Sequence, residues 1–333
     1  MTPTATAFNG WAADVDDAVA AVSPGPDGRI AVAGSEGSLA LLSPAGEVEI
    51  RQTLSLGCLA VAWSPAGDRI AVGCIDGIVI VDSVGHQIAR HRGGWCSSLA
   101  WSFDGARLAA GTGKSSVVYG ADGAELFRHD RDSTVSTVGW INRRVASAAY
   151  GGVHVCHVSQ GAAADVLPFT GSLLTMAISP DRRWAASGNQ DATLHVWRVG
   201  KAGEELSMSG YPTKITALAF SPDSMLLASG GGQDVTVWDF GGRGPRGSTP
   251  RILAAHRQSV TGLAWSPRGD MLAAVADDGC VAIWEPRAGS PGRPLDVLDR
   301  LDRSVPASAV CWVGSDRLVA AWADGTVATH RVG

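Results

Sequence analysis

The chain has 333 residues, of which 45% are hydrophobic and 18% charged, a composition that favours a folded core over a disordered chain. Its net charge of −5 argues against a protein that coats nucleic acid or an anionic membrane surface. The 42 Gly and 12 Trp, against 6 Phe and 3 Tyr, indicate many short strands joined by tight turns rather than helices.

The N-terminal segment, residues 1–10, lacks the basic start and apolar run of a secretory signal, and no apolar stretch in the chain is long enough to span a membrane. We therefore expect a cytoplasmic protein. The cysteines have no CxxC spacing and mostly stand where Val, Ala or Gly stand in equivalent strands, so reduced, buried thiols are expected at Cys58, Cys74, Cys96, Cys156, Cys280 and Cys311.

A repeated segment runs through the whole chain, and Leu59–Gly73 is its clearest copy. Aligned on a Ser-Pro corner or its equivalent, eight copies are found, at Ser23, Ser64, Ser102, Ile141, Ser179, Ser221, Ser266 and Val313. The spacings of 38 to 47 residues are typical of propeller blades and predict an all-β, eight-bladed propeller of four-stranded antiparallel sheets, forming a single domain over residues 1–333. Seven blades is the alternative, if unit 1, 4 or 8 is an extension.

Each unit is predicted to supply three strands and then a fourth that leads into the next unit. An N-terminal strand, Thr4–Phe8, is expected to close the ring by pairing near Val327–Thr329. In unit 2 the first three strands are Leu59–Trp63, Arg69–Gly73 and Ile78–Val81. The predicted fourth strands of the successive units are Val48–Arg51, Gln87–Arg90, Glu125–Arg128, Asp165–Leu167, Glu204–Ser207, Arg251–Leu253 and Leu295–Leu298.

Small residues recur one and three positions before the bulky residue of each first strand, as at Ala62 and Ala60 before Trp63. Alternate residues of a strand face opposite sides, so small and large residues segregate onto two faces. This segregation suits wedge-shaped blades that converge on an axis.

The segments Leu194-His-Val-Trp-Arg198, Val235-Thr-Val-Trp-Asp239 and Val281-Ala-Ile-Trp-Glu285, with Ala255-His256 before a first strand, resemble WD-repeat propellers. The resemblance covers essentially the whole chain and implies an interaction platform rather than a particular activity. The family's structural set of His, Ser or Thr, Trp and turn Asp is nearly intact only in unit 7, as His256, Asp277 or Asp278, and Trp284.

A closer resemblance is carried by segments from Gly171 to Pro245, among them Met208-Ser-Gly-Tyr-Pro-Thr-Lys214. It is similar to bacterial WD-repeat proteins without an established activity, some of them encoded beside zinc-trafficking GTPases of the CobW type.

The loops at the mouth of the expected central channel carry aromatic and cationic residues. Rigid aromatic rings beside cations suit a peptide or an anionic ligand. Alternatively, each ring fills a gap between blades. The candidate partner-binding residues are Trp11, Trp95, Tyr150, Tyr211, Lys214, Trp322, His256 and Arg257, with His91, Arg92, His129 and Arg131 nearby.

The segment Met208–Lys214 stands where a generic unit carries Gly-His. Pro212 stiffens this loop, which would present Tyr211 and Lys214 to a ligand at low entropic cost. A locally repacked loop is the alternative.

Zinc ligation is a weaker hypothesis at two places. His154 and His195 occupy equivalent third-strand positions in adjacent units, and Cys58 and Cys96 equivalent first-strand positions. Filling of the core by these side chains is the simpler explanation.

No nucleophile elbow, HExxH motif, phosphate loop or dinucleotide fingerprint occurs in a suitable context. We therefore expect a non-catalytic, monomeric scaffold that binds a protein or peptide at the channel mouth, with no cofactor and no nucleic-acid or membrane partner. The alternatives are a zinc-homeostasis accessory protein, which binds zinc or docks on a metal-trafficking GTPase, and an unrecognised enzyme with its site at the mouth.

Overall fold

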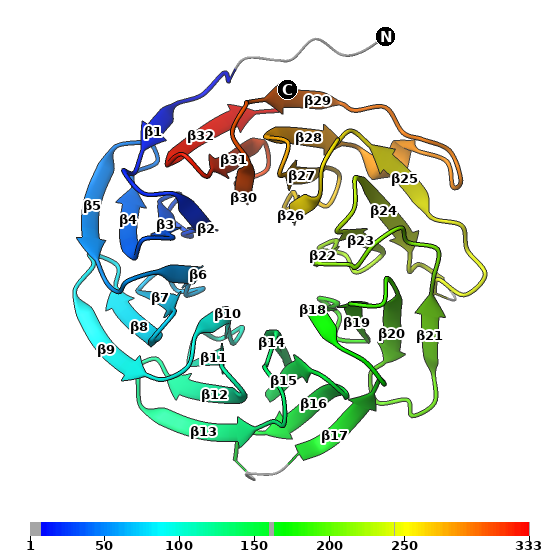
Figure 1. Ribbon diagram of the computed structural model, residues 1–333, viewed down its shortest axis with the longest axis horizontal. Helices are drawn as coiled ribbons and strands as arrows, with labels where there is room; N and C mark the ends of the chain where they lie inside the picture. The colour runs from blue at the N-terminus through cyan, green and yellow to red at the C-terminus, as the bar shows by residue number, and fades with distance from the viewer. Residues whose placement is uncertain (1–7, 160–162, 243, 333) are drawn as a thin grey trace. The chain divides into compact units, whose positions relative to one another are not determined.

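The computed structural model describes residues 8–159, 163–242 and 244–332, and these form eight four-stranded antiparallel sheets (Figure 1). Each sheet is one blade of an eight-bladed β-propeller fold, as predicted. The seven-bladed alternative is wrong, because units 1, 4 and 8 each supply strands to a complete sheet.

Two compact units divide the chain, with the boundary inside β18 (Leu173–Ile178). We call them the N-terminal unit, residues 13–176 with 324–326, and the C-terminal unit, residues 177–323 with short segments from both ends of the chain. The expectation of a single domain over residues 1–333 stays a prediction.

Blades 1 to 4 lie in the N-terminal unit and take their strands in chain order, four to a blade. These strands are β2 (Val19–Pro24), β3 (Ile30–Gly34), β4 (Ser38–Leu42), β5 (Val48–Thr53), β6 (Cys58–Trp63), β7 (Arg69–Cys74), β8 (Gly77–Asp82), β9 (Gln87–Arg92), β10 (Cys96–Trp101), β11 (Arg107–Thr112), β12 (Ser115–Gly120), β13 (Glu125–Asp130), β14 (Thr137–Ile141), β15 (Arg144–Ala149), β16 (Gly152–His157) and β17 (Ala163–Pro168).

Blades 5 to 8 belong mainly to the C-terminal unit, and blade 8 has the order β1-β32-β31-β30. Their strands are β18 (Leu173–Ile178), β19 (Trp184–Asn189), β20 (Leu194–Arg198), β21 (Glu205–Met208), β22 (Ala217–Phe220), β23 (Leu226–Gly230), β24 (Asp234–Asp239), β25 (Arg251–Ala254), β26 (Val260–Trp265), β27 (Leu272–Ala276), β28 (Cys280–Trp284), β29 (Asp299–Asp302), β30 (Ala307–Val313), β31 (Arg317–Trp322), β32 (Thr326–Arg331) and β1 (Ala12–Asp14).

The one helix among the described residues is the 3-10 turn η1 (Pro286–Ala288). No described helix is long and apolar enough to cross a membrane.

The recurring serine ties the turn between the first and second strands of a blade. In blade 2, Ser64 Oγ accepts a hydrogen bond from the Arg69 N–H at 3.1 Å and donates one to Asp68 at 2.9 Å. Ser221 does the same in blade 6, accepting from the Leu226 N–H and donating to Asp223. The repeat marker is therefore a turn in which one hydroxyl satisfies a backbone donor and a carboxylate acceptor.

Tryptophans at the ends of first strands link neighbouring blades within each unit. Trp101 Nε1–H donates to the Ala62 carbonyl at 3.0 Å, and Trp265 Nε1–H donates to the Ala219 carbonyl at 2.9 Å. The same bond recurs from Trp140 to Ala100 and from Trp312 to Ala264. The acceptor is in each case the alanine that precedes the last residue of a first strand. Its small side chain leaves its carbonyl accessible to the indole of the next blade.

The hydrophobic core lies between neighbouring blades. One cluster joins blades 1 and 2 through Leu41, Val72 and Val79, and another joins blades 6 and 7 through Val237, Leu272 and Trp284, all of them buried. Each blade thus buries its apolar surface against the blade beside it, which is how a repeat too thin for its own core becomes stable.

The N-terminal strand is the fourth strand of blade 8, but its predicted position is wrong for the described residues. Thr4 to Ala7 of the predicted strand lie outside them, and Phe8 is in no strand. The pairing strand is Ala12–Asp14, beside β32 (Figure 1). The Thr329 N–H donates to the Trp11 carbonyl at 2.9 Å, and Phe8 instead places its ring edge-on to Trp322 at 5.2 Å.

The predicted fourth strand Leu295–Leu298 is also wrong, because pairing begins at Asp299. Leu295 donates its N–H to Ile252 in the preceding blade, and its side chain packs against the core of blades 6 and 7. The apolar residues of this segment therefore lie in a loop and pack against the core between blades 6 and 7.

Candidate functional site

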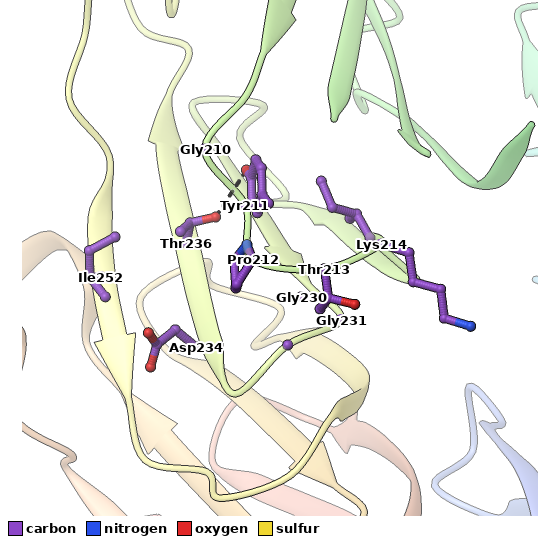
Figure 2. A pocket seen from close by; sticks show the side chains of 12 residues that line it. Gly210, Tyr211, Pro212, Thr213, Lys214, Gly230, Gly231, Asp234, Thr236 and Ile252 are labelled. Atoms are coloured by element: carbon purple, nitrogen blue, oxygen red, sulfur yellow. Dashed lines mark hydrogen bonds between the residues drawn. The ribbon is translucent and has the colours of Figure 1, made fainter. Parts of the chain in front are cut away.

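The loop leading into blade 6 turns the Tyr211 hydroxyl into the blade. Trp238 Nε1–H donates to this oxygen at 2.7 Å, and Ser229 Oγ lies 2.8 Å away. Thr236 Oγ1–H donates to the same tyrosine oxygen at 3.0 Å (Figure 2). Tyr211 thus completes a polar set in which every hydroxyl has a partner. Of the two interpretations made from sequence, the repacked loop describes the phenol, whose hydroxyl is hydrogen-bonded within blade 6.

In blade 4, the loop residue equivalent to Tyr211 is also hydrogen-bonded within its own blade. Tyr211, Arg131 and His256 each stand four residues before a buried apolar residue that begins the first-strand segment. Arg131 is buried and donates to Ser147 and to the Gly152 carbonyl. The sequence placed these residues near a binding surface, whereas the structure directs the side chains of Arg131 and Tyr211 into their own blades.

A pocket of about 130 Å³ lies beside this loop in the C-terminal unit, between residues 210–215 and the hairpin 230–232 (Figure 2). Its apolar wall includes Tyr211, Pro212 and Ile252. Engineered apolar cavities of about 150 Å³ hold benzene, so this pocket suits one apolar side chain. Among the described residues that line it, no nucleophile is hydrogen-bonded to a general base.

Two exposed side chains of opposite charge line the pocket. The Lys214 side chain extends away from Asp234, the exposed carboxylate that also lines it (Figure 2). Arg257 is exposed in the next loop, where its carbonyl accepts a hydrogen bond from Gln233, beside the pocket's hairpin, at 2.8 Å. Lys214 and Asp234 therefore offer charges of both signs at an apolar recess.

The remaining predicted residues of the C-terminal unit are less accessible. Trp322 is fully buried: its indole N–H donates to the Gly279 carbonyl, and Arg303 lies 5.0 Å from its ring. Trp322 therefore fills the blade and cannot contact a partner in this conformation. His256 is buried as well, and Trp11 is half-buried.

In the N-terminal unit, Trp95 and Tyr150 are 56% and 59% exposed at the tips of their loops. Two further apolar side chains, Leu56 and Ile75, are 87% and 45% exposed in equivalent loops of blade 2. Their loops are joined by the hydrogen bond from the Ile75 N–H to the Gly57 carbonyl. The exposure of Leu56 and Ile75 was not predicted from the sequence, because an aliphatic residue next to a strand is usually interpreted as part of the hydrophobic core.

The zinc candidates have other partners. His154 Nδ1 lies 3.0 Å from His129 Nε2, and burial, with the charge of Arg131, lowers the pKa of His154 to about 4. His195 Nε2 lies 3.3 Å from Glu205.

The cysteine candidates also have other partners. Cys58 Sγ lies 3.9 Å from Cys74 Sγ, and the Cys96 thiol contacts the Ser98 carbonyl. Burial raises the pKa of Cys96 to about 12. All six cysteines are buried free thiols, as predicted.

Four segments of the chain match the model of the WD domain, G-beta repeat: residues 51–81, 166–198, 204–239 and 247–285. Each begins in or shortly before the fourth strand of one blade and ends in, or one residue after, the third strand of the next. WD40 repeats on an eight-bladed propeller together support a WD-repeat β-propeller family.

Among curated proteins, the chain is 37% identical over 118 residues to "Coronin-7" of Bos taurus, which is 33% of this chain and 12% of that protein. It is 26% identical over 151 residues to "Anaphase-promoting complex subunit cdh1" of Dictyostelium discoideum, 45% of this chain and 15% of that one. These alignments span a small part of the relatives' length. Both relatives are eukaryotic, and the predicted bacterial and zinc-GTPase link is not shown by them.

Among solved structures, Sqt1 from Chaetomium thermophilum has a TM-score of 0.84 at 18% identity, over 98% of this chain and all of that one. The C-terminal WD40 domain of Sif2 has a TM-score of 0.81 at 14% identity, with 98% of this chain and 100% of that one covered. At these identities the likeness shows the fold alone.

Proposed function

We propose that this WD40-repeat propeller is a non-catalytic scaffold that binds a peptide segment of a protein partner at the pocket beside Tyr211–Lys214. The carrying observation is the pocket itself, whose apolar wall can hold one side chain while the exposed Lys214 and Asp234 also line it. Rigid blades present these loops in a preformed arrangement, which lowers the ordering cost of binding. We expect a monomer in the cytoplasm.

The role of the loop residues differs from that inferred from the sequence. Tyr211 shapes the pocket floor from within the blade, while Pro212 and Thr213 line it and Lys214 is exposed at its edge. A suitable ligand inserts a single leucine- or phenylalanine-sized side chain and places polar groups near Lys214 and Asp234. The exposed Trp95 and Tyr150 offer a separate contact region in the N-terminal unit.

The test is selection of displayed random peptides on the purified full-length chain, followed by affinity measurement with fluorescently labelled peptides. We expect enriched peptides to share one apolar residue and to bind the Thr213→Trp variant at least about tenfold more weakly, because the indole fills the pocket mouth. The loss of about 1.4 kcal/mol corresponds to that factor.

The chain has three lysines, Lys114, Lys201 and Lys214, which provides a matched control. Lys214→Glu is expected to change peptide affinity, whereas Lys201→Glu, in the exposed turn between β20 and β21, is not. Peptides that bind wild type and Thr213→Trp equally would place the site elsewhere, and the Trp95→Ala variant would then test the N-terminal unit.

A further inference from the structure

His256, in the loop before β26, carries two buried nitrogens without hydrogen bonds. Its side chain is 0% exposed, and neither Nδ1 nor Nε2 has a hydrogen-bond partner. A buried polar atom without a partner is uncommon in folded proteins and calls for a physical explanation, such as a bound ion or water.

Blade 7 lacks the hydroxyls that satisfy the equivalent loop residue in blade 6. There, Leu227 pairs with Trp238, and Ser229, two residues further, contacts Tyr211. In blade 7, Leu272 pairs with Trp284, and the residue two positions further is Ala274. Trp284 Nε1 is also buried without a partner. Blade 7 therefore has the loop histidine and the third-strand tryptophan, but it has no second-strand serine whose hydroxyl could bond to them.

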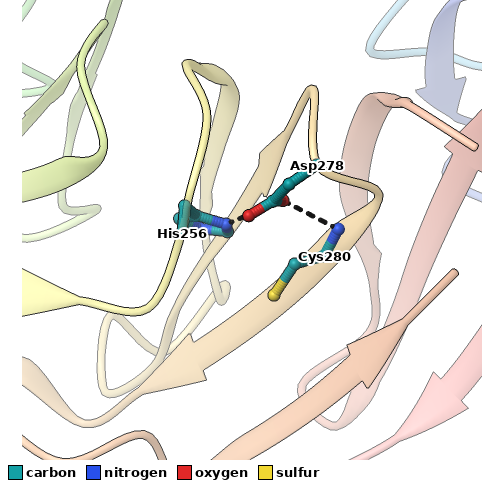
Figure 3. Close-up of side chains that lie close together, drawn as sticks. All are labelled: His256, Asp278 and Cys280. Atoms are coloured by element: carbon teal, nitrogen blue, oxygen red, sulfur yellow. Dashed lines mark hydrogen bonds and ion pairs between the residues drawn. The ribbon is translucent and has the colours of Figure 1, made fainter. Parts of the chain in front are cut away.

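Two other metal-binding side chains face the same point. Ligand atoms of His256, Asp278 and Cys280 all lie within 4.8 Å of one another, and His256 Nδ1 is 3.6 Å from Asp278 Oδ1 (Figure 3). The Asp278 carboxylate is held by the N–H groups of Cys280 at 3.0 Å and Arg257 at 2.6 Å. The hairpin between β27 and β28 thus presents the carboxylate and the thiol in fixed positions.

We propose that His256, Asp278 and Cys280 bind one divalent transition-metal ion of the zinc type. Imidazole, thiolate and carboxylate are its usual ligands, whereas magnesium and calcium take oxygen ligands. Bonds of about 2.0 to 2.3 Å in a tetrahedron put ligand atoms roughly 3.3 to 3.8 Å apart. Side-chain shifts of about 1 Å therefore complete the site, and water takes the fourth position.

The surroundings are consistent with a cation. Arg300 is the nearby positive side chain on β29, and its Nε lies 2.8 Å from an Asp302 carboxylate oxygen, so its charge is already paired. Metal binding requires a neutral imidazole and a thiolate, so the thiol proton of Cys280 leaves to solvent as the ion binds.

The experiment uses the untagged full-length chain, stripped of metal with a chelator and titrated with Co²⁺ as a spectroscopic probe. We expect one Co²⁺ per chain, with a thiolate-to-cobalt absorption band in the near ultraviolet, and a higher melting temperature with Zn²⁺. Cys280→Ser should lose the band, and Asp278→Asn should weaken binding by about tenfold or more.

The matched control is Cys74→Ser, which removes a buried thiol of the Cys58–Cys74 pair and should retain the band. Circular dichroism of the metal-free variants confirms that each is folded. If wild type shows no cobalt–thiolate band, or if the band is lost in Cys74→Ser but kept in Cys280→Ser, the proposed site is wrong. A water molecule alone would produce neither the band nor the zinc-dependent melting shift.

Discussion

Removal of the Tyr211 hydroxyl tests whether this tyrosine is a structural member of blade 6. In Tyr211→Phe, Ser229 and Thr236 keep their mutual 2.6 Å hydrogen bond. The part-buried Trp238 indole N–H, which has no other hydrogen bond among the described residues, is left without an acceptor. An unsatisfied buried donor costs about 1 to 3 kcal/mol, which sets the expected loss of stability.

The expected melting shift follows from the size of the protein. At about 2.1 cal/mol/K per residue, a chain of 333 residues has an unfolding entropy of about 0.7 kcal/mol/K. The loss therefore lowers the melting temperature by roughly 1.5 to 4 °C. Urea unfolding followed by tryptophan fluorescence measures the same loss independently.

Tyr150→Phe is the control, since Tyr150 is 59% exposed, and it should change stability by less than about 0.5 kcal/mol. A double-mutant cycle with Trp238→Phe should give coupling of about 1 kcal/mol, because the two side chains share one hydrogen bond. Wild-type stability of Tyr211→Phe, or strict additivity with Trp238→Phe, would refute the reasoning.

Three further predictions concern buried polar groups. Ala274→Ser should stabilise the protein by about 0.5 to 1.5 kcal/mol in urea unfolding, because it supplies a hydroxyl beside His256 and Trp284. The same change should weaken cobalt binding. A loss of stability would show that the blade has no space for the hydroxyl. Burial, and then the charge of Arg131, lowers the pKa of His154 from 6.5 to about 4. As the pH falls, the unfolded chain therefore binds a proton at His154 before the folded chain does. The free energy of unfolding should decline between about pH 6.5 and about pH 4. His154→Gln should flatten that decline in urea titrations, and an unchanged slope would contradict the assignment. No thiol of the native chain should react promptly with a disulfide reagent, whereas all six should react in urea; rapid native labelling would mean that a blade opens.

The number of blades could be predicted because each blade repeats the same local chemistry. The turn at Ser64 and the indole bond from Trp101 depend on residues that recur at a regular spacing, so the pattern is visible without coordinates. The closing strand could not be located this way, since Ala12–Asp14 is a short stretch whose pairing is set by partners more than 300 residues away.

The site was predicted only in outline. The departure of Met208–Lys214 from the repeat singled out a loop whose residues line a pocket, but the direction of the Tyr211 hydroxyl depends on Ser229 and Trp238. Burial separates Trp322 from the exposed Trp95, although the sequence placed both near the same surface. Cys280 was interpreted as a buried thiol, and its proximity to His256 depends on how the loop before β26 lies against the hairpin between β27 and β28.

The pairing of β1 with β32 has a consequence for synthesis on the ribosome. Asn9 and Arg331 are hydrogen-bonded to each other across 322 residues of sequence. At about 5 to 20 residues per second, the N-terminal strand waits roughly 15 to 60 s for its partner to emerge. During that interval β1 stays unpaired, and a chaperone or a neighbouring polysome chain can bind it before the last blade is complete.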